Sequence, residues 1–67
     1  MSKLAENLIK EREKRKLKQK EIAIQIGLLP DTYRKYEKGS REPDMDTLIK
    51  IANYYQTSTD YLLGRYN

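Results

Sequence analysis

Residues 19–38, with the sequence QKEIAIQIGLLPDTYRKYEK, decide how this chain folds. Apolar residues recur at helical spacing over residues 19–26, and a second helical pattern covers residues 30–38. Gly27 can end the first helix in the left-handed conformation, and Pro30 suits the first turn of the second. Because so few residues separate them, we expect two helices that cross through a tight turn.

Such a crossing places particular demands on side chains. Two helices joined by a turn of three or four residues meet at about 90–120°, so a small residue is needed where they touch. Ala23 stands at that position. Apolar anchors on both helices are supplied by Ile22, Ile26, Leu28, Tyr33 and Tyr36.

A further helix is predicted before this pair, over residues 3–16. Leu4, Leu8 and Arg12 follow one another at i, i+4 spacing, and the remaining faces are mostly charged. With only about two apolar turns, this helix must pack on another element to be stable.

Two more helices are predicted after the pair. Asp44 can cap a helix over residues 45–55, and Ser58 can cap a short one over residues 59–63 that Gly64 closes. The expected fold class is all-α, a compact five-helix bundle with a helix-turn-helix formed by the second and third helices. With 67 residues, the chain is expected to form a single domain over residues 1–67.

The composition excludes most chemistry. The chain has no cysteine and no histidine, so thiolate and imidazole ligands, thiol nucleophiles and the usual neutral-pH general base are missing. We therefore expect no enzyme, no metal, no cofactor and no small-molecule substrate.

The charged N-terminal segment is not a signal peptide, and no apolar run is long enough to span a bilayer. A cytoplasmic protein without a membrane partner is expected.

Positive charge is concentrated in one half of the sequence. Residues 1–41 hold 12 Lys and Arg against 6 Asp and Glu, a local charge of +6, whereas residues 42–67 hold 2 against 4, a local charge of −2. A basic half favours an anionic partner such as nucleic acid, although a solvated surface also accounts for it.

The motifs resemble the lambda-repressor-like (Xre/Cro) helix-turn-helix DNA-binding family, and the resemblance covers nearly the whole chain. The residues that carry it, in family order and spacing, are Arg12, Leu17-Lys18-Gln19, Ile22-Ala23, Ile26-Gly27, Tyr36-Glu37-Lys38-Gly39, Arg41-Glu42-Pro43, Leu48-Ile49-Lys50-Ile51-Ala52 and Asp60-Tyr61-Leu62-Leu63-Gly64.

This resemblance implies that residues 30–38 form a recognition helix lying in the major groove of double-stranded DNA. Its base-facing positions would be Leu29, Pro30, Asp31, Thr32, Arg34 and Lys35. The positions implied to contact phosphates are Lys18, Gln19, Lys38, Gly39, Ser40 and Arg41, of which Gln19 matches the family glutamine that grips a phosphate.

Three charged residues of the recognition helix admit two interpretations each. Arg34 and Lys35 can read guanine through its O6 and N7 acceptors, or they can contact phosphate alone. Asp31 can accept from cytosine N4, but an aspartate in a first turn more often complements the helix dipole.

The resemblance further implies an ion pair between Arg12 and Glu37 that ties the first helix to the end of the recognition helix. The alternative is that both side chains are exposed to solvent.

The chain also departs from the family pattern. Lys18 and Leu29 replace the usual Ser or Thr, Glu11 occupies a usually apolar position, and Lys16 and Gln56 stand where glycine is common.

Tyrosines crowd the acidic half of the chain. Tyr54, Tyr55, Tyr61 and Tyr66 are interpreted as a candidate dimer surface, or alternatively as a roof over the small core.

The functional hypothesis is sequence-specific binding of double-stranded DNA by a transcriptional regulator that acts as a repressor. A homodimer, at least on DNA, would place two recognition helices on a palindromic operator. The alternative is an antitoxin-like or adaptor module that binds another protein on the same scaffold.

Overall fold

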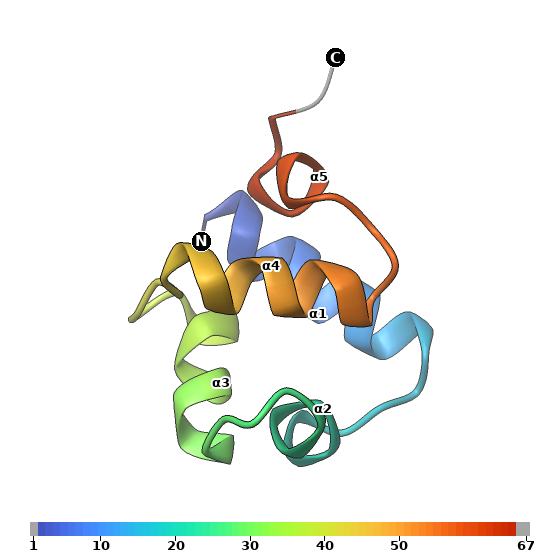
Figure 1. The fold of residues 1–67 in the computed structure, drawn as a ribbon, viewed down its shortest axis with the longest axis vertical. Coiled ribbons are helices and arrows are strands. Elements are labelled where there is room, and N and C mark those ends of the chain that lie inside the picture. Colours follow the sequence, from blue (N-terminus) through green and yellow to red (C-terminus); the bar gives the residue numbers. More distant parts are fainter. Residues whose placement is uncertain (1, 66–67) are drawn as a thin grey trace.

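Five helices make up the part of the chain that the structure, a computed structural model, describes, which is residues 2–65 (Figure 1). They are α1 (Lys3–Lys14), α2 (Gln19–Gln25), α3 (Pro30–Lys38), α4 (Met45–Tyr54) and α5 (Thr59–Leu63). The all-helical class and the helix-turn-helix of α2 and α3 are confirmed for these residues.

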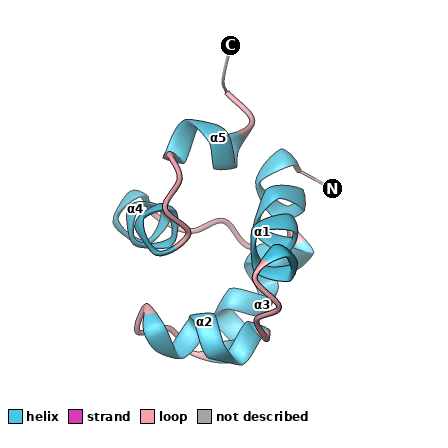
Figure 2. Cartoon of the chain, turned by 90° about the vertical axis from the view of Figure 1, so that its right-hand side faces the viewer, coloured by secondary structure: helices cyan, strands magenta, loops and turns pink. Residues whose placement is uncertain are grey.

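The helices enclose a core to which each contributes one large, fully buried side chain. These side chains are Leu8, Ile22, Tyr33, Ile51 and Leu62. α1 packs against α3 and α5, α2 packs against α3, and α4 packs against α5. Seen from the side, α1 and α4 face each other, with α2 and α5 at opposite ends (Figure 2). α2 therefore lies at the end of the molecule away from α5, and α3 packs against both α2 and α1.

Helix starts follow the expected capping chemistry. Asp44 Oδ1 accepts from the Thr47 N–H at 2.8 Å, and this hydrogen bond holds the pKa of Asp44 below its usual value. Ser58 caps α5 in the same way, with Oγ 3.0 Å from the Tyr61 nitrogen. α2 lacks a side-chain acceptor at Lys18, but Glu21 Oε1 accepts from the Lys18 N–H at 2.7 Å.

Helix ends share one device, a left-handed residue just past the helix. The residues are Lys16, Gly27, Gly39, Gln56 and Gly64, with φ between 54° and 82°. The N–H of the residue that follows each of them donates a hydrogen bond to the carbonyl five residues earlier in the chain, as Leu17 does to Arg12 at 3.2 Å. Three helices are shorter than predicted and end at Lys14, Gln25 and Tyr54, because the residues just before the left-handed positions no longer have helical dihedral angles.

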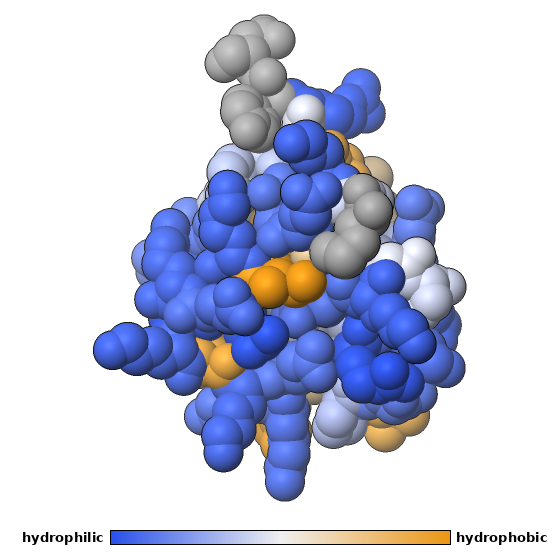
Figure 3. Space-filling view, turned by 180° about the vertical axis from the view of Figure 1, so that it is seen from behind, coloured by the Kyte–Doolittle hydropathy of each residue, from blue (hydrophilic) through white to orange (hydrophobic). Residues whose placement is uncertain are grey.

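The surface is mainly hydrophilic, as seen from behind in Figure 3, where hydrophobic residues form only small separate patches. The large hydrophobic side chains that remain exposed are Ile24, Leu29, Met45 and Ile49. Within residues 2–65, every helix is too short or too polar to cross a membrane.

Glycine at the two strained helix ends should stabilise the protein. Lys16 and Gln56 adopt φ of 57° and 54°, a region that glycine enters without the clash of a Cβ. Lys16→Gly and Gln56→Gly should each raise the free energy of unfolding by roughly 0.5–1 kcal/mol in urea titrations. Lys10→Gly, in the exposed middle of α1, is the matched control and should lower it by about 1 kcal/mol. Destabilisation by all three changes would contradict this account of the helix ends.

Candidate nucleic-acid interface

The turn between α2 and α3 brings the two helices into close contact. Ala23 is fully buried, and its carbonyl accepts from the Leu28 N–H at 2.8 Å, which fixes the backbone as it leaves α2. The carbonyl of Leu29 then accepts from Thr32 and Tyr33 and starts α3. The small residue expected at the crossing is therefore in place, and α3 presents its outer face to solvent.

Glu37, near the end of α3, is buried and paired. Its carboxylate accepts from Arg12 Nε at 2.7 Å and from Arg12 Nη2 at 3.1 Å, a two-pronged ion pair between α1 and α3. Only 3% of the Glu37 side chain is exposed, against 16% for Arg12. The hydrogen bond from Arg12 to Glu37 raises the pKa of Arg12. The expected ion pair is present in the structure.

A third side chain meets the same carboxylate. Gln19, the first residue of α2, donates from Nε2 to Glu37 Oε1 at 3.0 Å. Because a carboxylate only accepts, the Gln19 amide nitrogen must face Glu37, and one of its two N–H groups remains for another acceptor. Glu37 thus joins α1, α2 and α3 at a single point.

The residues expected near phosphates surround this point. Lys18 precedes α2 and is exposed, and residues 38–41, which follow the outer face of α3, are exposed as well. Gly39 has φ of 82°, so the chain turns sharply there. Both candidate phosphate segments therefore lie beside this junction, since Lys18 adjoins Gln19 and residues 38–41 adjoin Glu37.

The outer face of α3 carries an ion-pair cluster that sequence reasoning missed. Asp31 Oδ1 accepts from Arg34 Nη2 at 2.6 Å and from Arg34 Nε at 3.0 Å, while Asp31 Oδ2 lies 3.3 Å from Lys35 Nζ. The Arg34 hydrogen bond lowers the pKa of Asp31. The signal was available, because the two cations stand three and four residues after the aspartate.

The remaining candidate base-facing residues lie at the start of α3. Leu29 is 73% exposed, more than the other large hydrophobic residues that the structure leaves uncovered, and Pro30 is exposed beside it. Thr32 is half-buried. Leu29 and Pro30 therefore form an apolar tip next to the charged cluster.

Tyr33 and Tyr55 lock α3 to α4 through their hydroxyls, which lie 2.8 Å apart. Burial raises the pKa of both phenols, that of Tyr55 to about 12, so both stay neutral. Tyr55 is 1% exposed, and its assignment to a dimer surface is therefore wrong: it roofs the core. Tyr54 and Tyr61 are half-buried, and Tyr66 lies outside the described residues.

A second polar cluster centres on Glu11, which is 3% exposed. Its carboxylate accepts from Arg15 Nη1 at 2.8 Å and from the Tyr61 hydroxyl at 2.9 Å, which links α1 to α5. Burial raises the pKa of Glu11, but these hydrogen bonds and Lys14 outweigh it, and the pKa falls below its usual value. The pairing explains how a carboxylate occupies a usually apolar position.

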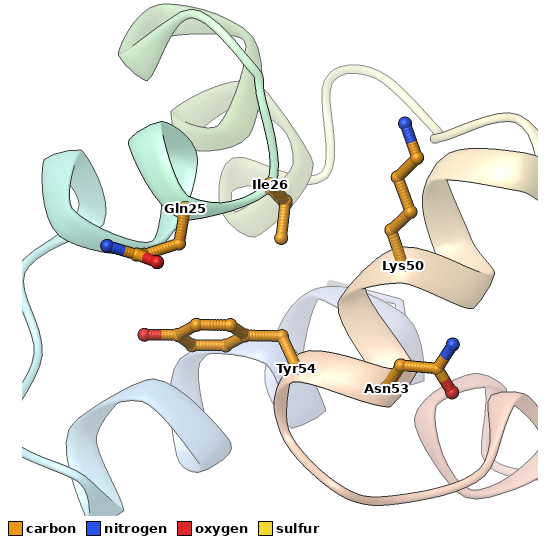
Figure 4. A pocket seen from close by; sticks show the side chains of 5 residues that line it. All are labelled: Gln25, Ile26, Lys50, Asn53 and Tyr54. Carbon is orange, nitrogen blue, oxygen red and sulfur yellow. The ribbon is translucent and has the colours of Figure 1, made fainter.

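An open hollow lies between the end of α2 and the outer side of α4 (Figure 4). Its lining side chains are Gln25, Ile26, Lys50, Asn53 and Tyr54. Tyr54 lies across the hollow beneath Gln25 and Ile26, and Lys50 stands at its edge.

Groups of acidic, histidine or cysteine side chains suited to a metal ion are absent from the described part of the chain.

Comparison with known families places these features in context. The helix-turn-helix family matches residues 8–62, which include α2, α3 and the Arg12–Glu37 pair. The chain belongs to this lambda-repressor-like (Xre/Cro) helix-turn-helix family.

Two relatives and one solved structure show how far the likeness extends. The chain is 49% identical over 59 residues to the uncharacterized HTH-type transcriptional regulator YqaE of Bacillus subtilis, covering 88% of this chain and 51% of that protein. It is 38% identical over 64 residues to the cryptic phage CTXphi transcriptional repressor RstR of Vibrio cholerae, covering 96% and 57%. The crystal structure of a transcriptional regulator from Listeria innocua matches with a TM-score of 0.87 and 33% identity, over 96% of this chain and 60% of that one. The chain spans about half the length of the curated relatives it matches.

Loss of Arg12 should destabilise the fold sharply. Arg12→Ala leaves the Glu37 carboxylate buried with Gln19 alone, and the free energy of unfolding should fall by about 3 kcal/mol. Lys14→Ala, on the same helix, removes a side chain that is 63% exposed and should change it by less than about 0.5 kcal/mol. Equal melting temperatures for the two variants would show that the pair does not hold the helices together.

Glu11 should contribute to acid sensitivity. Since its pKa in the folded state is lowered from 4.5, its ionised form stabilises the protein above that pH, and the contribution is lost as pH falls through the lowered pKa. Glu11→Gln should therefore be less stable at pH 7 by about 1–3 kcal/mol and lose less stability below about pH 4.5. Denaturant midpoints between pH 7 and pH 3 measure this. Glu13→Gln is the control for removing a charge from α1, and an unchanged acid slope in Glu11→Gln would refute the assignment.

Proposed function

We propose that this chain binds double-stranded DNA with sequence specificity and regulates transcription as a repressor. The observation that carries the proposal is the placement of Gln19 beside α3 by the Glu37 carboxylate, next to an outer α3 face with Arg34 and Lys35. Family membership and a relative named as a transcriptional repressor support it. We expect such a regulator to act in the cytoplasm.

Contacts with phosphates and contacts with bases would have different roles in DNA recognition. Phosphate contacts from Lys18, the free N–H of Gln19 and residues 38–41 would fix the position of α3 and would not depend on sequence. Base contacts from the N-terminal half of α3 would read the major groove. Within that half, Arg34 suits guanine, and Leu29, exposed just before α3, suits the methyl group of thymine.

Operator symmetry follows from pairing two chains. A homodimer on DNA would set two copies of α3 about 34 Å apart, which matches two half-sites of a palindrome one helical turn apart. Tyr54 and Tyr61, both half-buried, remain the candidate dimer surface within the described residues.

Selection of binding sites from random DNA at two salt concentrations tests the proposal. The wild-type chain should enrich a palindromic sequence, and its affinity should fall steeply with salt because phosphate contacts release counterions. Arg34→Ala should cost about 1–3 kcal/mol in operator binding and lose the base preference at one position of each half-site. Lys50→Ala, which removes an exposed cation from α4, is the matched control and should leave that preference intact.

Two outcomes would count against the proposal. An affinity that is unchanged between low and high salt would exclude the phosphate-based mechanism. Absence of any sequence preference, together with a stable complex with a partner protein, would favour the alternative of an antitoxin-like or adaptor module.

A further inference from the structure

The guanidinium of Arg34 is held along one edge only. Asp31 Oδ1 accepts from Nε and Nη2, which form the side edge of the group. A guanidinium has five N–H donors in a fixed plane, so the end edge, formed by Nη1 and the outer N–H of Nη2, is left for another acceptor. Guanine offers O6 and N7 as a matching pair of acceptors in the major groove.

The direction of the side chain fits this use. Side chains of a helix lean toward its N-terminus, and Asp31 lies one turn before Arg34, so pairing holds the guanidinium over the first turns of α3. Those turns are the part of a recognition helix that meets base edges. Asp31 itself is 60% exposed, and Lys35 Nζ lies 3.3 Å from its second oxygen.

Helix-dipole chemistry alone does not account for this arrangement. Asp31 and Asp46 each occupy the second residue of a helix, α3 and α4, where a carboxylate complements the dipole. Lys50 follows Asp46 by four residues, yet the structure forms no ion pair between them within residues 2–65, whereas Asp31 engages both Arg34 and Lys35. The cation pairing is therefore a property of α3 and not of a first-turn aspartate in general.

A carboxylate at this position changes what the cations can gain from DNA. The Asp31 carboxylate repels a nearby phosphate and offsets the positive charge of Arg34 and Lys35. Contacts that these two cations make with the DNA backbone alone are therefore weakened. At a guanine, the end edge of the Arg34 guanidinium can donate to O6 and N7 while its side edge stays paired with Asp31. The same carboxylate thus disfavours non-specific binding and leaves guanine recognition open.

We propose that Asp31 is a specificity-determining residue that positions Arg34 to read guanine and suppresses binding to the phosphate backbone alone. This inference rests on the DNA-binding function proposed above. It assigns Asp31 no base contact of its own, in contrast to an interaction with cytosine N4.

Asp31→Ala and its matched control Asp46→Ala test the inference in the full chain. Each removes an aspartate from the second position of a helix and changes the net charge by the same amount. Asp31→Ala should bind a random duplex about threefold more tightly at 0.1 M salt, with a salt slope steeper by about one. Its preference for guanine at the base pair that Arg34→Ala affects should fall about three- to tenfold. Asp46→Ala should keep the wild-type preference.

A double-mutant cycle separates positioning from a general charge effect. In the Arg34→Ala background, Asp31→Ala should cause no further loss of guanine preference at that base pair. If Asp31→Ala changes only the salt dependence and keeps the guanine preference, the positioning role is wrong. Loss of preference at a different base pair would show that Asp31 reads a base directly, which also overturns the inference. If the wild-type chain binds no duplex, the proposed function itself fails, and the inference fails with it.

Discussion

The fold depends on one buried carboxylate, that of Glu37. Only 3% of its side chain is exposed, and a charge so poorly hydrated is tolerated only when it is paired and hydrogen-bonded. Arg12 from α1 and Gln19 from α2 meet this need, so three helices must keep one relative placement for the charge to stay satisfied. The same constraint sets the start of α2 beside the end of α3. A structural requirement of the core therefore fixes the geometry of the candidate interface.

Polar clusters supplement a core that is small for five helices. Each helix supplies one large, fully buried side chain. The gaps between helices are bridged by Glu11 with Arg15 and Tyr61, by Asn7 with α5 carbonyls, and by the Tyr33–Tyr55 hydroxyl pair. Within residues 2–65, each of the buried side-chain nitrogen and oxygen atoms has a hydrogen-bond partner. Such networks specify one packing arrangement only when every member is satisfied. They join α1 to α5 and α3 to α4, and the charged outer face of α3 stays exposed.

Most of the fold can be predicted from local sequence signals, whereas the rest depends on contacts between residues far apart in the sequence. Capping residues such as Asp44 and Ser58, the tight turn at Gly27 and the small Ala23 are readable from neighbouring residues, and all lie where the sequence predicts them. The sequence predicts the ends of α1, α2 and α4 one or two residues too late, because the residue before each left-handed position already departs from helical dihedral angles. For Tyr55 the sequence permits either a dimer surface or a roof over the core, and only the packing of α3 on α4 decides between the two. The contact between Gln19 and Glu37 joins residues 18 positions apart, and no periodicity within one helix reveals it.

The central claim is that Glu37 holds Gln19 and α3 together as one DNA-facing surface. Titration of the ¹⁵N-labelled chain with its selected operator tests this most directly, because amide resonances report each contact separately. We predict that the Gln19 side-chain N–H signals and the backbone amides of α3 and residues 38–41 shift together, while α5 amides stay in place. Shifts confined to α4 and α5, with the Gln19 side chain unperturbed, would contradict the claim.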